Sequence, residues 1–113
     1  MYDFILTSVY MVTASLLAEN ELTQALRALA DPTRRRILAL LKRRGCCSIG
    51  KGVGLCACDI EAQIKLSQPT ISHHMAALKQ AGLVESEKIG QWMWYRRNQR
   101  ALSELARALA REI

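Results

Sequence analysis

The chain has 113 residues, 50% of them hydrophobic, with a formal net charge of +6 and a pI near 9.5. This length predicts one small domain over residues 1–113, and the hydrophobic content excludes an intrinsically disordered chain. The basic charge favours an acidic partner, with nucleic acid ahead of a membrane surface.

The first residues are apolar but are not typical of a targeting segment. MYDFILTSVYMVTASLLA lacks the basic start of a signal peptide, and Asp3 and Thr7 interrupt its apolar character. It is also too short to span a bilayer. We interpret residues 2–18 as a helix with its apolar face against a partner. We expect a cytoplasmic protein without a membrane partner, in which thiols stay reduced.

Two helices are predicted next. Residues 20–30 place apolar side chains on one face at helical spacing, namely Leu22, Ala25, Leu26 and Leu29. Asp31 and Pro32 are typical of a helix start, because Asp caps a helix and Pro suits the first helical position. The second helix, residues 32–43, is expected to carry inward Ile37, Leu38 and Leu41.

All four cysteines lie in one window of thirteen residues: Cys46, Cys47, Cys56 and Cys58. The stretch GCCSIGKGVGLCA has no apolar period, and a loop of this length in a compact domain is usually functional or disordered. Its glycines do not match a phosphate-binding loop, which needs Gly-x-x-x-x-Gly-Lys-Ser/Thr. We interpret them as flexibility that lets two cysteine pairs meet.

A helix-turn-helix is predicted after the cysteines. Residues 57–65 form a short helix, Leu66–Ser67 makes the turn with Ser67 as N-cap, and residues 68–81 form the second helix, which Gly82 closes. The expected core residues of the two helices are Ile60, Ile64, Ile71, Met75 and Leu78.

A β-hairpin and a last helix complete the prediction. The hairpin consists of strands 83–88 and 91–97, joined at Ile89–Gly90. Residues 99–112 form an amphipathic helix, and the residues on its apolar face are Leu102, Leu105, Ala106 and Leu109. A hairpin directly after a helix-turn-helix is a wing. The predicted fold class is therefore mainly α with a β-hairpin wing (α+β), a winged helix-turn-helix.

The second helix of the helix-turn-helix is the candidate recognition helix, whose outward side chains are small and polar. Gln68 can bond an adenine edge bidentately, and hydroxyl groups can reach a base or a phosphate. Lys88, at the wing tip, can enter the minor groove or touch phosphate. The predicted DNA contacts are Gln68, Thr70, Ser72, His73 and Lys88.

Other polar and aromatic residues of this region receive more ordinary interpretations. His74, next to a core position, is expected to be a packed histidine rather than a ligand. Trp92 and Trp94 are interpreted as hairpin and core packing, because they follow a period of two in a strand. Arg96 and Arg97, at the far end of the hairpin, are candidate phosphate contacts.

Separated motifs over roughly residues 20–100 resemble the ArsR–SmtB family of metal-responsive winged-helix repressors. The motifs are, in order, DPTR, LCACD, SQPTISHHMAALKQAGLV and GQWMWYR. The resemblance implies a homodimer that represses a metal-resistance operon and leaves double-stranded operator DNA when it binds the ion. It therefore implies a regulator and not an enzyme. Arsenic-responsive members carry Leu-Cys-Val-Cys-Asp before the recognition helix, and Cys56, Ala57, Cys58 and Asp59 match it closely.

The chain also departs from the family pattern. Arsenic repressors place a third cysteine three residues after the second, where this chain has Glu61. Cadmium and lead members bring cysteines from an N-terminal arm, but no cysteine precedes Cys46. Zinc members use Asp, His and Glu on the last helix, and residues 99–113 contain neither His nor Asp. The additional candidate ligands of this chain are Cys46 and Cys47, which precede the Cys56–Cys58 motif.

An all-sulfur site favours soft ions, because thiolates select them whereas imidazole and carboxylate suit zinc, nickel or manganese. The candidates are arsenite, antimonite, cadmium, lead and mercury, although a closed tetrathiolate could hold zinc. Arsenite needs three sulfurs, which Cys56, Cys58 and one of Cys46 or Cys47 can supply. Residues i and i+2 of a helix do not face each other, so an ion on Cys56 and Cys58 is expected to distort the first helical turn. No organic cofactor is expected.

Three alternatives remain open from the sequence. The same fold could serve a redox-sensing repressor, if basic neighbours such as Arg43, Arg44 and Lys51 lower the thiol pKa values. It could also sense cadmium or lead. An enzyme or carrier, such as a thiol-dependent arsenate reductase, is disfavoured because no phosphate loop follows a strand.

For the dimer, we expect the N-terminal and 99–112 helices to meet across a two-fold axis.

Overall fold

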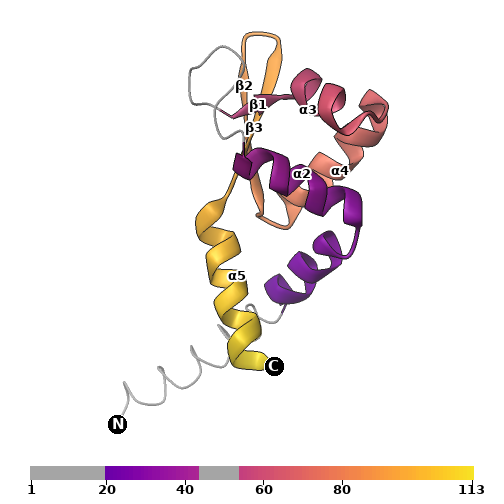
Figure 1. The fold of residues 1–113 in the computed structure, drawn as a ribbon. Coiled ribbons are helices and arrows are strands. Elements are labelled where there is room, and N and C mark those ends of the chain that lie inside the picture. Colours follow the sequence, from indigo (N-terminus) through magenta and orange to yellow (C-terminus); the bar gives the residue numbers. More distant parts are fainter. Residues whose placement is uncertain (1–19, 44–53) are drawn as a thin grey trace.

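The computed structural model describes residues 20–43 and 54–113 (Figure 1). Residues 20–29 are helical, and the elements that follow are α2 (Pro32–Arg43), β1 (Leu55–Cys56), α3 (Ala57–Ile64), α4 (Gln68–Gln80), β2 (Val84–Ile89), β3 (Trp92–Arg97) and α5 (Gln99–Glu112). The mainly helical architecture with a hairpin after the α3–α4 pair confirms the predicted fold class. The predicted helix at 2–18 and the pair Cys46–Cys47 lie outside the described residues.

Local side-chain chemistry explains where α2 begins, whereas the start of α4 has no such capping bond. The Asp31 carboxylate accepts hydrogen bonds from the backbone N–H groups of Thr33, at 2.7 Å, and Arg34, at 3.3 Å, so it caps α2 as predicted. Ser67 is the N-cap of α4, as predicted, with extended backbone. Its hydroxyl lies 2.9 Å from the Thr70 hydroxyl and makes no capping bond to the backbone.

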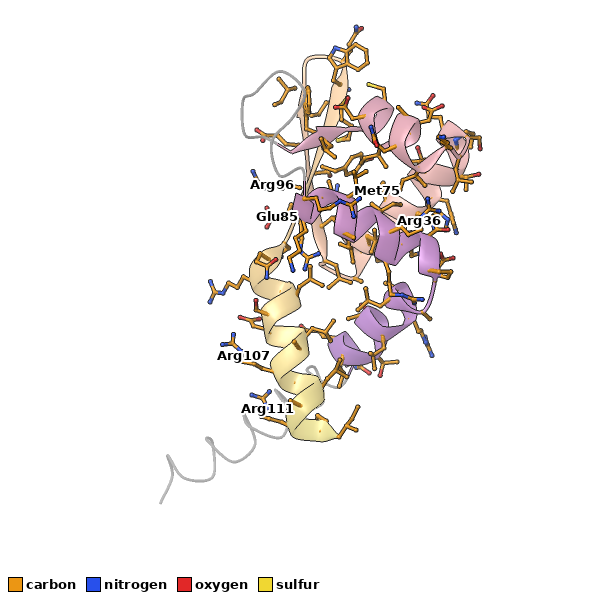
Figure 2. All side chains as sticks on the ribbon, in the orientation of Figure 1. Arg36, Met75, Glu85, Arg96, Arg107 and Arg111 are labelled. Atoms are coloured by element: carbon orange, nitrogen blue, oxygen red, sulfur yellow. The ribbon has the colours of Figure 1, made fainter. Side chains whose placement is uncertain are left out.

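One hydrophobic core joins α2, α3, α4 and the base of the hairpin. Met75, at the centre of α4, is fully buried and points into this core (Figure 2). Its buried partners include Ile37, Leu38, Leu40, Leu41, Leu55, Ile60, Ile64, Ile71, Leu78, Leu83 and Val84. Every inward residue predicted for α2, α3 and α4 is among them, so the helical periodicity located the core correctly.

The sheet has three antiparallel strands in the order β1-β3-β2. In the hairpin, Glu85 pairs with Arg96 and Ile89 pairs with Trp92. The turn follows Ile89, one residue later than predicted, and Gly90 takes a positive φ of 62°. The two residues of β1 were not predicted as a strand. They add a third strand beside β3, and this strand contains Cys56.

Residues 20–29 and α5 lie side by side (Figure 1), but their inward faces differ from the prediction. Ala28 is buried instead of Leu26, which is 41% exposed. Ala106 is also exposed, whereas Leu105 is buried against this chain's own residues. A polar group at Leu105 would therefore disturb the packing within one chain as well as any dimer. No helix in the described ranges is long and apolar enough to cross a membrane.

Candidate DNA-binding surface and thiol site

The predicted contact residues of α4 lie on its outer face. Gln68, Ser72 and His73 are exposed, while the opposite face carries the buried Ile71 and Met75. Thr70 is exposed as well, but its hydroxyl already pairs with Ser67. The polar face therefore stands in solvent, as a face that enters a DNA groove must, and the contacts themselves stay a prediction.

A side-chain hydrogen bond connects α4 to the start of α2. His74 is buried, which confirms its interpretation as a packed histidine, and its Nδ1 accepts a hydrogen bond from Arg34 Nε at 3.1 Å. Because Nδ1 is the acceptor, the neutral ring carries its proton on Nε2. This bond adds a polar link between the two helices to the apolar contacts of Ile71 and Met75 in the core.

We expect the Arg34–His74 bond to stabilise the protein by roughly 1–2 kcal/mol, because one partner is charged and the other is buried. His74→Leu and Arg34→Ala, alone and together, form a double-mutant cycle measured by urea unfolding. His74→Asn, whose Oδ1 can take the place of Nδ1, should recover part of the loss. Additive single effects would mean that the two side chains do not interact.

The basic residues of the wing have different environments. Lys88 is exposed beside the turn, as predicted. Arg96, however, forms an ion pair with Glu85 at 2.7 Å, and Figure 2 shows both residues where the hairpin meets the helices. Arg97 donates a hydrogen bond to the Leu38 carbonyl at 3.1 Å, so it anchors β3 on α2. Both arginines therefore have partners within the chain, and their contact with phosphate stays a prediction.

The two tryptophans of β3 have opposite surroundings. Trp94 is buried, which confirms its predicted role in packing. Trp92 is 51% exposed, so the same interpretation is wrong for this residue. Both side chains lie on one face of the strand, but the hairpin extends beyond the core and leaves Trp92 in solvent.

Cys56 and Cys58 face each other at the start of α3. Cys56 ends β1 and is the N-cap of α3, with extended backbone at φ −78° and ψ 165°. Cys58 is exposed in the first helical turn, and the two Sγ atoms lie 2.8 Å apart. The premise that both cysteines are helical is therefore wrong, because Cys56 stands outside the helix and turns its sulfur toward Cys58. The effect of an ion on this turn stays a prediction.

Asp59 completes a small polar cluster around Cys56. The Cys56 thiol donates to Asp59 Oδ2 at 3.2 Å, and the Cys56 backbone N–H donates to the same oxygen at 3.4 Å. Burial, together with the hydrogen bond to Cys58 and the nearby Asp59 carboxylate, raises the pKa of the Cys56 thiol to about 11. The low thiol pKa assumed for a redox sensor is therefore wrong for Cys56, because peroxide reacts with the thiolate.

The donor atoms at this site suit a soft ion but are incomplete. Two sulfurs stand together without a histidine, which is the chemistry that arsenite, antimonite or cadmium prefers. Within residues 20–43 and 54–113, no three His, Cys, Asp or Glu side chains are grouped to hold a metal ion. The predicted third sulfur, from Cys46 or Cys47, lies outside these ranges.

Known proteins are similar to this chain in both sequence and fold. Residues 31–86 match the family described as "Bacterial regulatory protein, arsR family". The arsenical resistance operon repressor of Staphylococcus aureus is 39% identical over 90 residues, which cover 80% of this chain and 78% of the relative.

Two solved structures extend the likeness to three dimensions. An ArsR-like transcriptional regulator from Rhodococcus sp. RHA1 superposes with a TM-score of 0.68 at 33% identity, over 83% of this chain and 80% of the other. A homodimeric winged helix-turn-helix DNA-binding domain from Mycobacterium bovis gives 0.65 at 25% identity, over 87% and 82% of the two chains. With its helix-turn-helix, its wing and these relatives, the chain belongs to the arsR family of bacterial regulatory proteins and is a DNA-binding transcriptional regulator, not an enzyme.

Proposed function

We propose that the protein represses a metalloid-resistance operon and leaves its operator when arsenite or antimonite binds the cysteine thiols. The observation that carries this proposal is the pair Cys56–Cys58, whose sulfurs lie 2.8 Å apart at the start of α3. The helix α3 packs on the candidate recognition helix α4 through Ile60, Ile64 and Ile71. The relative named as an arsenical resistance operon repressor supports the same ligand class.

The DNA-binding form we propose is a cytoplasmic homodimer in which residues 1–113 act as one domain. The exposed N-terminal half of α4 enters the major groove through Gln68, Ser72 and His73, and Lys88 of the wing touches the backbone. Helix α5 contributes to the dimer contacts, together with the N-terminal helix that the sequence predicts. The homodimeric domain from Mycobacterium bovis supports a two-fold arrangement.

The inducer reaction follows from the state of the thiols. Neutral arsenous acid, As(OH)₃, condenses with three thiols to form three As–S bonds and three water molecules, so no net proton is released. Cys56 and Cys58 supply two sulfurs, and one of Cys46 or Cys47 supplies the third. When Cys56 gives up its proton to the departing hydroxide, it no longer donates to Asp59. The N-terminus of α3 thereby changes as the ion binds.

This reaction predicts different pH dependences for two inducers. Because the Cys56 pKa is raised to about 11, this thiol is protonated at neutral pH, and a divalent cation must displace its proton. The apparent affinity for cadmium should therefore rise at least about tenfold per pH unit near neutrality, whereas that for arsenite should stay nearly constant. Titration calorimetry in two buffers of different ionisation enthalpy measures the protons released.

The proposal is tested on duplex DNA that the protein itself selects from a random pool. Release is followed by fluorescence anisotropy as arsenite, antimonite, cadmium, lead, zinc or peroxide is added at constant salt, because DNA affinity depends strongly on salt. Arsenite or antimonite should release the DNA at the lowest concentration. Release by cadmium or lead at a lower concentration would identify a sensor of those ions, and release by peroxide alone would identify a redox sensor.

A further inference from the structure

We propose that the wing, through strand β1, carries the response of the thiol site to the DNA. This inference rests on the proposed function, because it concerns how an ion at Cys56 and Cys58 weakens DNA binding. Helix α3, which packs on α4, offers one route from the cysteines to the DNA. The contacts of Cys56 point instead to β3 and the hairpin that it forms with β2.

The residues of β1 are held closely against β3. Leu55 pairs with Tyr95, and Cys56 pairs with Trp94. Just before them, Gly54 has a φ of +101°, and a Cβ built there would lie only 1.9 Å from the Tyr95 carbonyl oxygen. Only glycine fits such a close approach. Any displacement of the Cys56 backbone therefore presses directly on the backbone of β3.

The Cys56 side chain makes the same connection. Cys56 and Trp94 pack together as a small buried cluster. An ion that binds both cysteines replaces the direct contact between the sulfurs of Cys56 and Cys58, 2.8 Å apart, with two bonds to itself, so the Cys56 side chain changes its position. On the buried side, that movement of Cys56 meets the Trp94 indole.

The elements joined to Cys56 differ in how firmly the core holds them. Helix α3 is anchored by Ile60, which is fully buried, and by Ile64. The hairpin leaves the core after Trp94, and the residues from Lys88 to Trp92 at its tip are all exposed. A force at Cys56 therefore displaces the hairpin more easily than α3. Since Lys88 lies at this tip, the displacement removes a contact with DNA.

The experiment compares two variants that both weaken DNA binding, only one of them in the wing. The wing variant is Lys88→Ala with Trp92→Ala, both at exposed positions, and the control is Ser72→Ala on α4. For each protein, DNA affinity is measured without arsenite and with saturating arsenite. The ratio of the two affinities is the release factor, expected to be about 5–150-fold for the unchanged protein.

We expect the Ser72→Ala variant to keep the full release factor, because its lost contact lies outside the route. The wing variant should bind DNA more weakly without arsenite and should lose most of the release factor, since the contact that arsenite breaks is already missing. An unchanged release factor in the wing variant, or unchanged DNA affinity without arsenite, would overturn the inference.

Arsenite binding to the free protein separates this inference from the proposed function. The chain has two tryptophans, so the wing variant retains Trp94 alone, and its fluorescence reports on the neighbourhood of Cys56. The wing variant should bind arsenite as tightly as the unchanged protein. If the unchanged protein fails to bind arsenite or to release DNA, the proposed function is wrong. If it does both and the wing variant releases equally, only the wing route is wrong.

Discussion

Replacing Cys56 or Cys58 by serine should abolish release by arsenite while leaving DNA affinity almost unchanged. In the proposed function each sulfur is a ligand, and neither lies on the outer face of α4, so the groups predicted to contact DNA stay intact. An ion that binds the free protein better than the DNA complex must weaken DNA binding by the same factor. Without one thiolate that difference disappears, and a release factor of about 5–150-fold should fall to about one.

The matched control for these variants is Ala57→Ser, which places a hydroxyl between the two cysteines without removing a sulfur. It should release DNA normally. Serine changes at Cys46 and Cys47 decide the third ligand: mild single effects with a severe double effect mean that either can serve. A Cys56→Ser variant that still releases DNA at the same arsenite concentration would remove this residue from the site.

The second large effect is expected on α4. Gln68→Ala or Ser72→Ala should cost about 1–3 kcal/mol of specific DNA binding if the side chain bonds a base edge, which is about 5–150-fold in affinity. Gln80→Ala is the matched control, because Gln80 is an exposed glutamine at the opposite end of the same helix. It should leave the affinity unchanged.

Binding to a scrambled duplex at the same salt separates lost specificity from lost charge. A base contact at Gln68 or Ser72 predicts weaker binding to the selected sequence and constant binding to the scrambled one. Equal loss on both duplexes would assign these residues to the phosphate backbone. No loss on either would mean that α4 does not read the DNA as we describe.

Periodicity and end signals were sufficient to predict α2, α3 and α4 and their core residues. The bounds of α2 follow from Asp31, which caps it, and from apolar spacing that ends at Arg43. Met75 and Ile60 are buried because they recur at helical spacing with other apolar residues. The alternation around Gly90 likewise predicted the hairpin. Each of these signals lies within a few residues of the element that it specifies.

The features that were missed depend on contacts between distant segments. The strand β1 has only two residues, and it exists because β3 pairs with it. Its extended backbone turns Cys56 toward Cys58, which helical spacing alone could not indicate. The hydrogen bond from Arg97 to the Leu38 carbonyl, 59 residues away, has no local signal that could predict it. Ala28 is buried and Leu26 is exposed, a difference that apolar spacing within one helix does not predict.

The most direct measurement is an arsenite titration of the complex between the unchanged protein and its selected DNA, at constant salt and pH. The proposed function predicts saturable release, a release factor of about 5–150-fold, and full reversal by an excess of a competing dithiol. DNA binding that stays constant at saturating arsenite, while calorimetry shows that the protein has bound the ion, would contradict it.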